Sequence, residues 1–254
     1  MARIVILDFS GIYGRMKFWK NEDVLRLDFQ TMEGTNCYCD DEAAEEIGKQ
    51  LGELGAEGIH FLDSGNYHYA KKLWADRICQ PFDLLVLVHH TDMQQPAFGG
   101  ILSCGGWLRT ALEENKFLQQ VCLMGPSEKM AEEDEIGEFG DRLLFFDEEK
   151  MQKGFWREFL NDGGEEEPKK RRPLYISLDK DILCEEEAEG NWDQGTVRLS
   201  EGLEVLEAAF RSRPVIGADL CGENPLDMED GEQLLKADSL NEKLLGALKR
   251  WMGN

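Results

Sequence analysis

Short apolar runs alternate along the chain with segments of helical periodicity. The runs are rich in Val, Ile, Leu and Phe without polar interruption, which is typical of strands that are buried on both faces of a sheet. Helical segments separate them, so that helix follows strand repeatedly, and this order predicts an α/β fold with a doubly wound parallel sheet. The predicted strands are 4–8, 58–62, 84–88, 120–124, 143–146, 174–178 and 215–220.

Helices are predicted in the intervening segments. In the first of them, Ala43, Ile47 and Leu51 keep to one face, and Asp40 or Asp41 can cap its amino end. The alternation continues without a compositional break, which predicts a single domain over residues 1–254. The other predicted helices are 67–75, 107–114, 128–143, 151–160, 200–211 and 234–252.

Composition limits the partners of this protein. The 254 residues carry a formal net charge of -23. Such a charge is repelled by nucleic acid and by anionic membranes, so we expect neither as a partner and favour small molecules and divalent cations. No apolar segment approaches the about 18 residues that span a bilayer, and a strand begins at residue 4 where a signal peptide would lie. We therefore expect a soluble, cytoplasmic protein.

The seven cysteines give little support to a disulfide framework or a structural zinc site. Their number is odd and their spacing irregular, which suits a reducing cytosol. Cys37 and Cys39 form a C-x-C pair, but too few histidines and cysteines lie nearby to complete four zinc ligands. A second unusual segment, 161–173, combines three glutamates with a basic run. It is interpreted as a solvated loop, with a basic docking patch as the alternative.

Ligand-type side chains follow three of the predicted strands. They are His68 after the second, His90 and Asp92 after the third, and Asp179 and Asp181 after the sixth. Residues two apart in an extended chain face the same side, and the carboxyl ends of parallel strands meet at one edge. A divalent cation would bind such groups and offset the repulsion between their carboxylates. Spacing alone leaves open a metal site or ordinary hydrogen-bonding residues.

Four segments carry a family resemblance. Tyr175 to Asp181 (YISLDKD) is similar to an S-x-D-x-D motif after a strand, and His90-Thr91-Asp92 to the end of D-A-H-T-D. Gly65 to Tyr69 is similar to G-G-D-H-S, and Val215 to Pro225 to a late strand that ends in an acidic residue before N-P. In order and spacing, residues 58 to 226 resemble the ureohydrolases, the family of arginase, agmatinase and formimidoylglutamase, whose fold histone-deacetylase-like enzymes share.

The resemblance implies a three-layer α/β/α domain around a parallel sheet of about eight strands. It also implies a site for two manganese ions, with zinc or iron as alternatives. His68, Asp92 and Asp179 would bind one ion, and His90, Asp179 and Asp181 the other. In this family the ions lower the pKa of a bridging water, and the resulting hydroxide attacks a guanidinium-type carbon. Trimers or hexamers are common in the family, which suggests a homo-oligomer.

Three positions depart from the family pattern. Val88 replaces an aspartate that bridges the two ions, and without that charge a single ion or a weak second one is expected. Cys104 replaces a proton-shuttling histidine, and it is either inert, a poor substitute or a nucleophile. Gly222 aligns with the guanidinium-binding glutamate, and Glu223 can take that catalytic role only if a local bulge turns it inward.

Three functions are consistent with these observations. The leading hypothesis is a metal-dependent hydrolase that acts on a C–N bond of a guanidino, amidino or amide substrate other than arginine or agmatine. The second is a protein that keeps the fold for binding or assembly and has lost catalysis. The third is a deacetylase-like enzyme with a single zinc ion.

Overall fold

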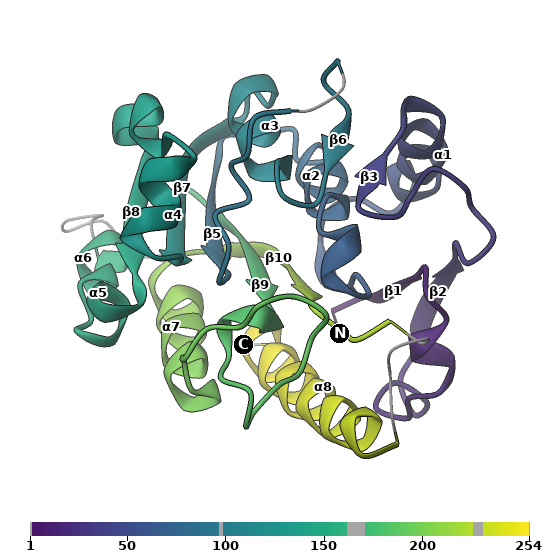
Figure 1. Ribbon diagram of the computed structural model, residues 1–254. Coiled ribbons are helices and arrows are strands. Elements are labelled where there is room, and N and C mark those ends of the chain that lie inside the picture. Colours follow the sequence, from purple (N-terminus) through teal and green to yellow (C-terminus); the bar gives the residue numbers. More distant parts are fainter. Residues whose placement is uncertain (1, 97–98, 162–170, 226–230, 254) are drawn as a thin grey trace.

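A parallel sheet of eight strands forms the centre of the computed structural model, which describes residues 2–96, 99–161, 171–225 and 231–253 (Figure 1). The strand order is β2-β1-β4-β10-β9-β5-β7-β8, and each adjacent pair is parallel. The predicted α/β fold and the sheet of about eight strands are confirmed. The strands are β1 (Ile4–Asp8), β2 (Val24–Asp28), β4 (Gly58–Phe61), β5 (Phe82–Leu87), β7 (Leu118–Gly125), β8 (Leu143–Asp147), β9 (Leu174–Asp179) and β10 (Val215–Cys221).

Helices cover both faces of the sheet, and this explains the unbroken apolar runs. In β5, Leu84 and Val86 pack into one hydrophobic cluster, whereas Leu85 and Leu87 pack into another on the opposite face. Both faces are therefore buried, and no polar alternation is required. The first cluster includes residues of α1 (Asp41–Gly52), α2 (Ala70–Ala75), α3 (Trp107–Glu114) and α4 (Glu128–Glu133). The second includes residues of α5 (Glu148–Gln152), α6 (Trp156–Asn161), α7 (Leu199–Ser212) and α8 (Gly231–Met252).

Two predicted helices are broken in the structure. The helix predicted over 128–143 is α4 followed by a 3-10 segment, Ile136–Arg142, because Glu135 and Gly140 have left-handed φ angles of 53° and 52°. The helix predicted over 151–160 is divided between α5 and α6 at Gly154, whose φ is 77°. Helical periodicity continued through both turns, so it gave no signal of either break.

Some strands were not predicted. β2 lies at an edge of the sheet, where its side chains are largely half-exposed and its short apolar run is interrupted by Arg26. A separate antiparallel pair, β3 (Tyr38–Cys39) and β6 (Leu102–Ser103), is too short for a periodic pattern. The predicted cap of α1 is confirmed at Asp40, whose Oδ1 accepts a hydrogen bond from the Ala43 amide at 2.8 Å.

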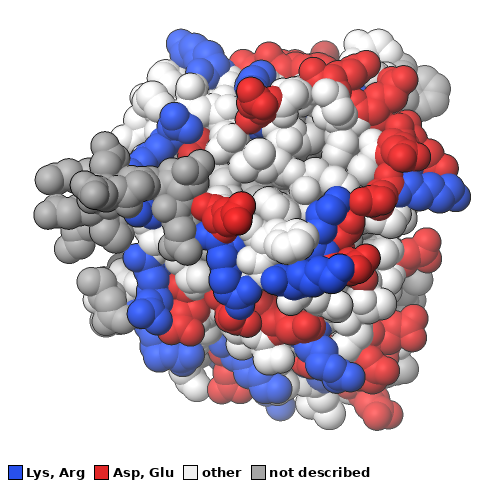
Figure 2. Space-filling model, turned by 90° about the vertical axis from the view of Figure 1, so that its left-hand side faces the viewer, with Lys and Arg blue, Asp and Glu red and all other residues white. Residues whose placement is uncertain are grey.

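The surface carries both signs of charge despite the large negative total. On the face shown in Figure 2, Lys and Arg side chains are interspersed with Asp and Glu. Most of the charged segment 161–173 lies outside the described residues. Of the helices that the structure describes, none combines the length and the apolar character of a membrane span.

Candidate metal centre

Four neighbouring strands, β4, β10, β9 and β5, bring their carboxyl ends together at one edge of the sheet. The predicted ligands follow three of them: His68 lies after β4, His90 and Asp92 after β5, and Asp179 and Asp181 at the end of β9. Asp92 has a φ of 54°, a left-handed turn that ends the extended segment after β5. All five side chains line one cavity of about 470 Å³. The structure therefore brings together every residue that was predicted as a metal ligand.

His68 lies between two carboxylates. Its Nδ1 is 3.0 Å from Asp92 Oδ2, and its Nε2 is in close contact with Asp179 Oδ2. Trp107 Nε1 donates a hydrogen bond of 2.6 Å to Asp92 Oδ2 and so fixes this carboxylate. Cys221 approaches the same group, since its Sγ and ligand atoms of His68 and Asp179 all lie within 4.8 Å of one another. The sequence gave no reason to include this cysteine.

His90 and Asp181 form a second pair beside the first. His90 Nδ1 is 2.9 Å from Asp181 Oδ2, and the His89 amide donates to Asp181 Oδ1 at 2.9 Å. The Asp181 amide in turn donates to Asp179 Oδ1 at 2.9 Å. Asp179 therefore faces the first pair with one oxygen and the second with the other, as expected for a shared ligand. The His89 side chain points elsewhere, with Nδ1 3.6 Å from Glu148 Oε1.

The donors present fit a divalent cation. His68 Nε2 and Asp179 Oδ2 are buried and contact each other, and neither has another hydrogen-bond partner among the described residues. Donor atoms in the two pairs are 2.9 and 3.0 Å apart, which matches adjacent ligands at about 2.1 Å from one ion. Imidazole and carboxylate together suit manganese, iron or zinc.

Burial and mutual charge shift the pKa values of these groups. Burial raises the pKa of Asp181 to about 6, and the charge of Asp179 adds to this effect. Burial alone would raise the pKa of Asp179, but the positive charges of His68 and Lys71 outweigh this effect and lower the pKa. Burial alone would lower the pKa of His90, but its hydrogen bond to Asp181 and the negative charges of the nearby aspartates together outweigh burial and raise the pKa. Negative charge is therefore concentrated on Asp179 at the centre of the site.

Val88, at the position of the absent carboxylate, is fully buried in the hydrophobic cluster of the first face. It supplies no donor atom. Cys104 lines the same cavity, but burial and the neighbouring Cys37 thiol raise its pKa, so it remains a thiol at neutral pH. Because the thiolate is the nucleophilic form, this environment favours the inert interpretation of Cys104.

Glu223 does not meet the condition that its predicted catalytic role required. Gly222 has a φ of 93° and produces a local turn, but Glu223 is absent from the described lining of the cavity. Its carboxylate pairs with Lys180 Nζ and accepts a hydrogen bond of 2.8 Å from Asn241 Nδ2 on α8. The turn therefore directs Glu223 towards α8, where direct contact with a substrate in the cavity is not supported.

Trp192 is a site residue that the sequence analysis missed. It lies in the connection between β9 and α7, is 42% exposed and lines the cavity. Its Nε1 donates to Asn66 Oδ1 at 3.0 Å, and its ring lies edge-on to His90 at 6.0 Å between centroids. The sequence signal that could have identified Trp192 is its place between Asn191 and Asp193. A large aromatic side chain in such a polar segment favours a surface or a binding site over the hydrophobic core.

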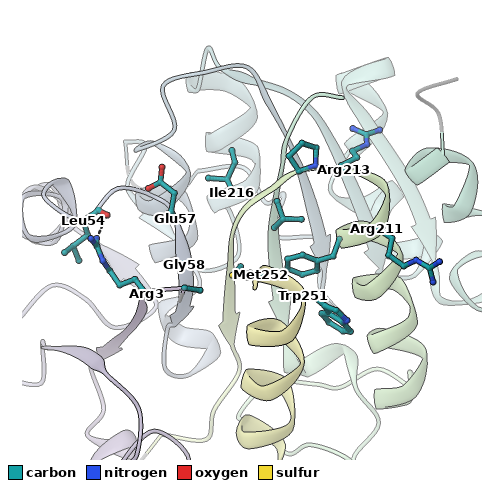
Figure 3. A pocket seen from close by; sticks show the side chains of 13 residues that line it. Arg3, Leu54, Glu57, Gly58, Arg211, Arg213, Ile216, Trp251 and Met252 are labelled. Carbon is teal, nitrogen blue, oxygen red and sulfur yellow. Dashed lines mark hydrogen bonds between the residues drawn. The ribbon is translucent and has the colours of Figure 1, made fainter. Parts of the chain in front are cut away.

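A larger cavity, of about 740 Å³, lies at the amino ends of the strands, on the opposite edge of the sheet (Figure 3). Its lining includes Arg3 before β1, Arg211 near the end of α7, and Trp251 near the end of α8. No histidine, cysteine or aspartate is among its described lining residues. The candidate metal chemistry is therefore confined to the smaller cavity.

The structure is a parallel α/β/α sheet with histidines and aspartates gathered at its carboxyl edge. The family model described as "Arginase family" matches residues 60–245, and the chain belongs to the arginase family. The resemblance noted in the sequence is confirmed. By contrast, a search of proteins with curated functions found no match.

Solved structures agree on the fold. Proclavaminate amidino hydrolase from Streptomyces clavuligerus superposes with a TM-score of 0.69 and 16% identity, over 99% of this chain and 93% of that one. Arginase from Bacillus caldovelox superposes with a TM-score of 0.65 and 15% identity, over 97% of this chain and 99% of that one. A Trypanosoma cruzi formiminoglutamase solved with Mn²⁺ superposes with a TM-score of 0.65 and 14% identity, over 97% of this chain and 93% of that one. At these identities the likeness establishes the fold alone.

Proposed function

We propose that the protein is a metal-dependent hydrolase that cleaves a C–N bond of a guanidino or amidino group. The observation that carries this proposal is the convergence of His68, His90, Asp92, Asp179 and Asp181 on the floor of one cavity. Membership of the arginase family supports the reaction class. Manganese is the expected ion, with zinc or iron as alternatives that the same donors accept.

The residues of the proposed centre would have two roles, to bind the ion and to hold the acidic side chains in position. Asp179 and Asp181, with His90, would hold the ion, and the ion would lower the pKa of a bound water. The hydrogen bond from Trp107 would hold Asp92 in place beside His68. Thr91 Oγ1 donates to Asp134, which fixes a further carboxylate at the rim of the cavity. Together these contacts hold the acidic side chains in position before a substrate arrives.

The lining of the cavity favours a cationic small-molecule substrate. Besides the predicted ligands it carries Glu133 and Asp134, and no Lys or Arg among the described residues. A guanidinium or amidinium group would be attracted, and Trp192 offers a ring face to a cation. A substrate carboxylate would find no Lys or Arg partner among the described residues of this lining. We therefore expect a guanidino or amidino compound without a free carboxylate near the reacting carbon.

The test is a turnover assay on protein loaded with Mn²⁺, Zn²⁺ or Fe²⁺ in parallel. Release of urea or ammonia would be measured across guanidino and amidino compounds with and without a carboxylate. We expect turnover of the compounds without one, and its loss in the Asp181→Asn variant. Lys150→Met, which changes a surface ion pair remote from the cavity lining, is the matched control. Metal binding without turnover of any compound would refute the proposal.

A second function, binding or assembly without catalysis, is favoured by one observation at Gly222. A Cβ atom there would lie 2.3 Å from Asp179 Oδ1, so this position cannot carry a glutamate side chain while Asp179 stays in place. Together with Val88, this removes two carboxylates that the family resemblance implies. Under this alternative, metal loading would raise the melting temperature while every substrate in the assay remained intact.

A further inference from the structure

Lys71 places a buried positive charge beside the candidate metal centre. We propose that the charge of its ammonium group opposes one of the two ions that the donors could hold, leaving a single-ion centre at His90, Asp179 and Asp181. The inference rests on the proposed metal-dependent function and goes beyond it, because it fixes the number of ions and assigns a role to a lysine.

The burial of Lys71 is the first observation. Its side chain is 1% exposed, and its Nζ makes no hydrogen bond to any residue that the structure describes. The nearest carboxylate among the described residues is that of Asp219, whose Oδ1 is 3.6 Å from Nζ, an ion-pair distance but too long for a hydrogen bond. An ammonium group has three N–H donors, so Asp219 alone does not satisfy it.

The position of Lys71 is the second observation. Lys71 follows His68 by three residues, and its amide donates to the His68 carbonyl at 3.0 Å, so both side chains project from the same helical turn. Its Nζ lies 5.9 Å from the ring of Trp107, the residue that donates to Asp92. The ammonium group therefore lies on the side of the centre formed by His68 and Asp92.

Several negative groups act on this ammonium at once. Burial alone would lower the pKa of Lys71, but Asp219, Asp179 and Asp92 outweigh it and raise the pKa. The same charge acts in return on Asp179, where it helps to lower the pKa of the carboxyl group. Lys71 is therefore a cation that pairs with Asp219 and also acts electrostatically on the nearby carboxylates.

Asp219 is held in place to anchor this cation. Ser177 Oγ donates to Asp219 Oδ1 at 3.0 Å, and the Tyr175 hydroxyl also interacts with Asp219. The Tyr175 hydroxyl is 2.9 Å from His60 Nδ1, which extends the buried network behind the sheet edge. If Lys71 swung out to admit an ion, Asp219 would remain buried without its counterion.

A fixed cation at this position opposes a metal ion bound by His68, Asp92 and Asp179. Like charges a few ångströms apart repel strongly in a buried site. Val88 adds no carboxylate that could offset the repulsion. The donors of the other pair, His90 and Asp181, lie on the far side of Asp179 and keep their capacity for one ion.

The experiment counts bound ions. Full-length protein would be dialysed to equilibrium against Mn²⁺, manganese per chain would be measured by mass spectrometry, and spin coupling between ions by electron paramagnetic resonance. The variants are Lys71→Met and the double variant Lys71→Met with Asp219→Asn, which removes both charges and avoids an unpaired buried aspartate. Lys72→Met, on the same helix but paired with Asp76 and Glu114, is the matched control.

We expect one uncoupled ion per chain in the wild type and in Lys72→Met. Either Lys71 variant should bind a second ion at least on the order of a hundredfold more tightly than the wild type does, with a coupled spectrum. Two coupled ions in the wild type, or no gain in either Lys71 variant, would overturn the inference and leave the hydrolase proposal intact. A wild type that binds no ion would overturn both, whereas one ion without turnover of any substrate would overturn the hydrolase proposal alone.

Discussion

Replacement of Gly222 tests how closely the chain around the metal centre is packed. In Gly222→Ala, the new Cβ would lie 2.3 Å from Asp179 Oδ1 and 3.0 Å from the Lys180 amide nitrogen. Its φ of 93° also lies in the region that side chains disfavour. Both effects act on the same short segment, which carries the central ligand of the proposed centre.

The magnitude follows from these two effects. A left-handed conformation of a residue with a side chain costs about 1–3 kcal/mol. To relieve the overlap, Asp179 must move and weaken the hydrogen bond of 2.9 Å that it accepts from the Asp181 amide. A hydrogen bond to a charged group contributes about 1.5–3 kcal/mol. We therefore expect Gly222→Ala to lower the free energy of unfolding by about 3–5 kcal/mol.

Gly140→Ala is the matched control. Gly140 also has a positive φ, 52°, but a Cβ there would meet nothing within 4 Å. It should therefore show the conformational cost alone, about 1–3 kcal/mol. Urea denaturation would give the free energies of unfolding, and titration calorimetry the Mn²⁺ affinity, which should fall only in Gly222→Ala. Equal stability of the two variants, with unchanged Mn²⁺ affinity, would refute the reasoning.

Three further predictions concern other parts of the molecule. Asp83→Asn should lower the free energy of unfolding by about 3–5 kcal/mol in urea denaturation. Asp83 pairs with Arg213 at 2.6 Å and with Arg172 at 2.7 Å, and loss of its charge leaves Arg213 buried without a carboxylate partner. A decrease of less than about 1 kcal/mol would contradict this prediction. Cys104→Ala should keep kcat within a few-fold, since its thiol stays protonated, and a large loss would restore the nucleophile interpretation. Burial lowers the pKa of His60 to about 3, so its contribution to stability is complete above the unfolded pKa of about 6.5 and is lost as pH falls towards 3. Between pH 7 and 4.5 we expect His60→Gln to lose about 2 kcal/mol less stability than the wild type, and parallel curves would exclude this effect.

The sequence predicted the central elements well, and it also predicted which polar side chains gather at the edge of the sheet, because both depend on local order. Apolar runs identified β1, β4, β5, β7, β8, β9 and β10, and the polar residues that follow β5 and β9 gave four candidate ligands that line one cavity in the structure. A ligand after a strand needs only the direction of that strand to be placed. The edge strand β2 was not predicted, because a half-exposed edge strand has no long apolar run.

The missed residues depend on contacts that no local pattern reports. Lys71 stands in Ala-Lys-Lys-Leu-Trp, which reads as an ordinary helical segment with solvated lysines. Its buried charge is paired with Asp219, which lies on strand β10 far along the chain. Glu223 was uncertain for a similar reason, since the turn at Gly222 and the partner Lys180 together decide which way it points.

The place of β10 in the sheet sets the order in which the centre can assemble. β10 lies between β4 and β9 but is the last strand of the sheet to leave the ribosome. Until it inserts, β4 with His68 has no partner on that side, whereas β5 and β9 can already pair and bring His90 to Asp181. The donors of the proposed single-ion centre thus belong to one folding unit, and His68 joins them only when long-range pairing closes the sheet.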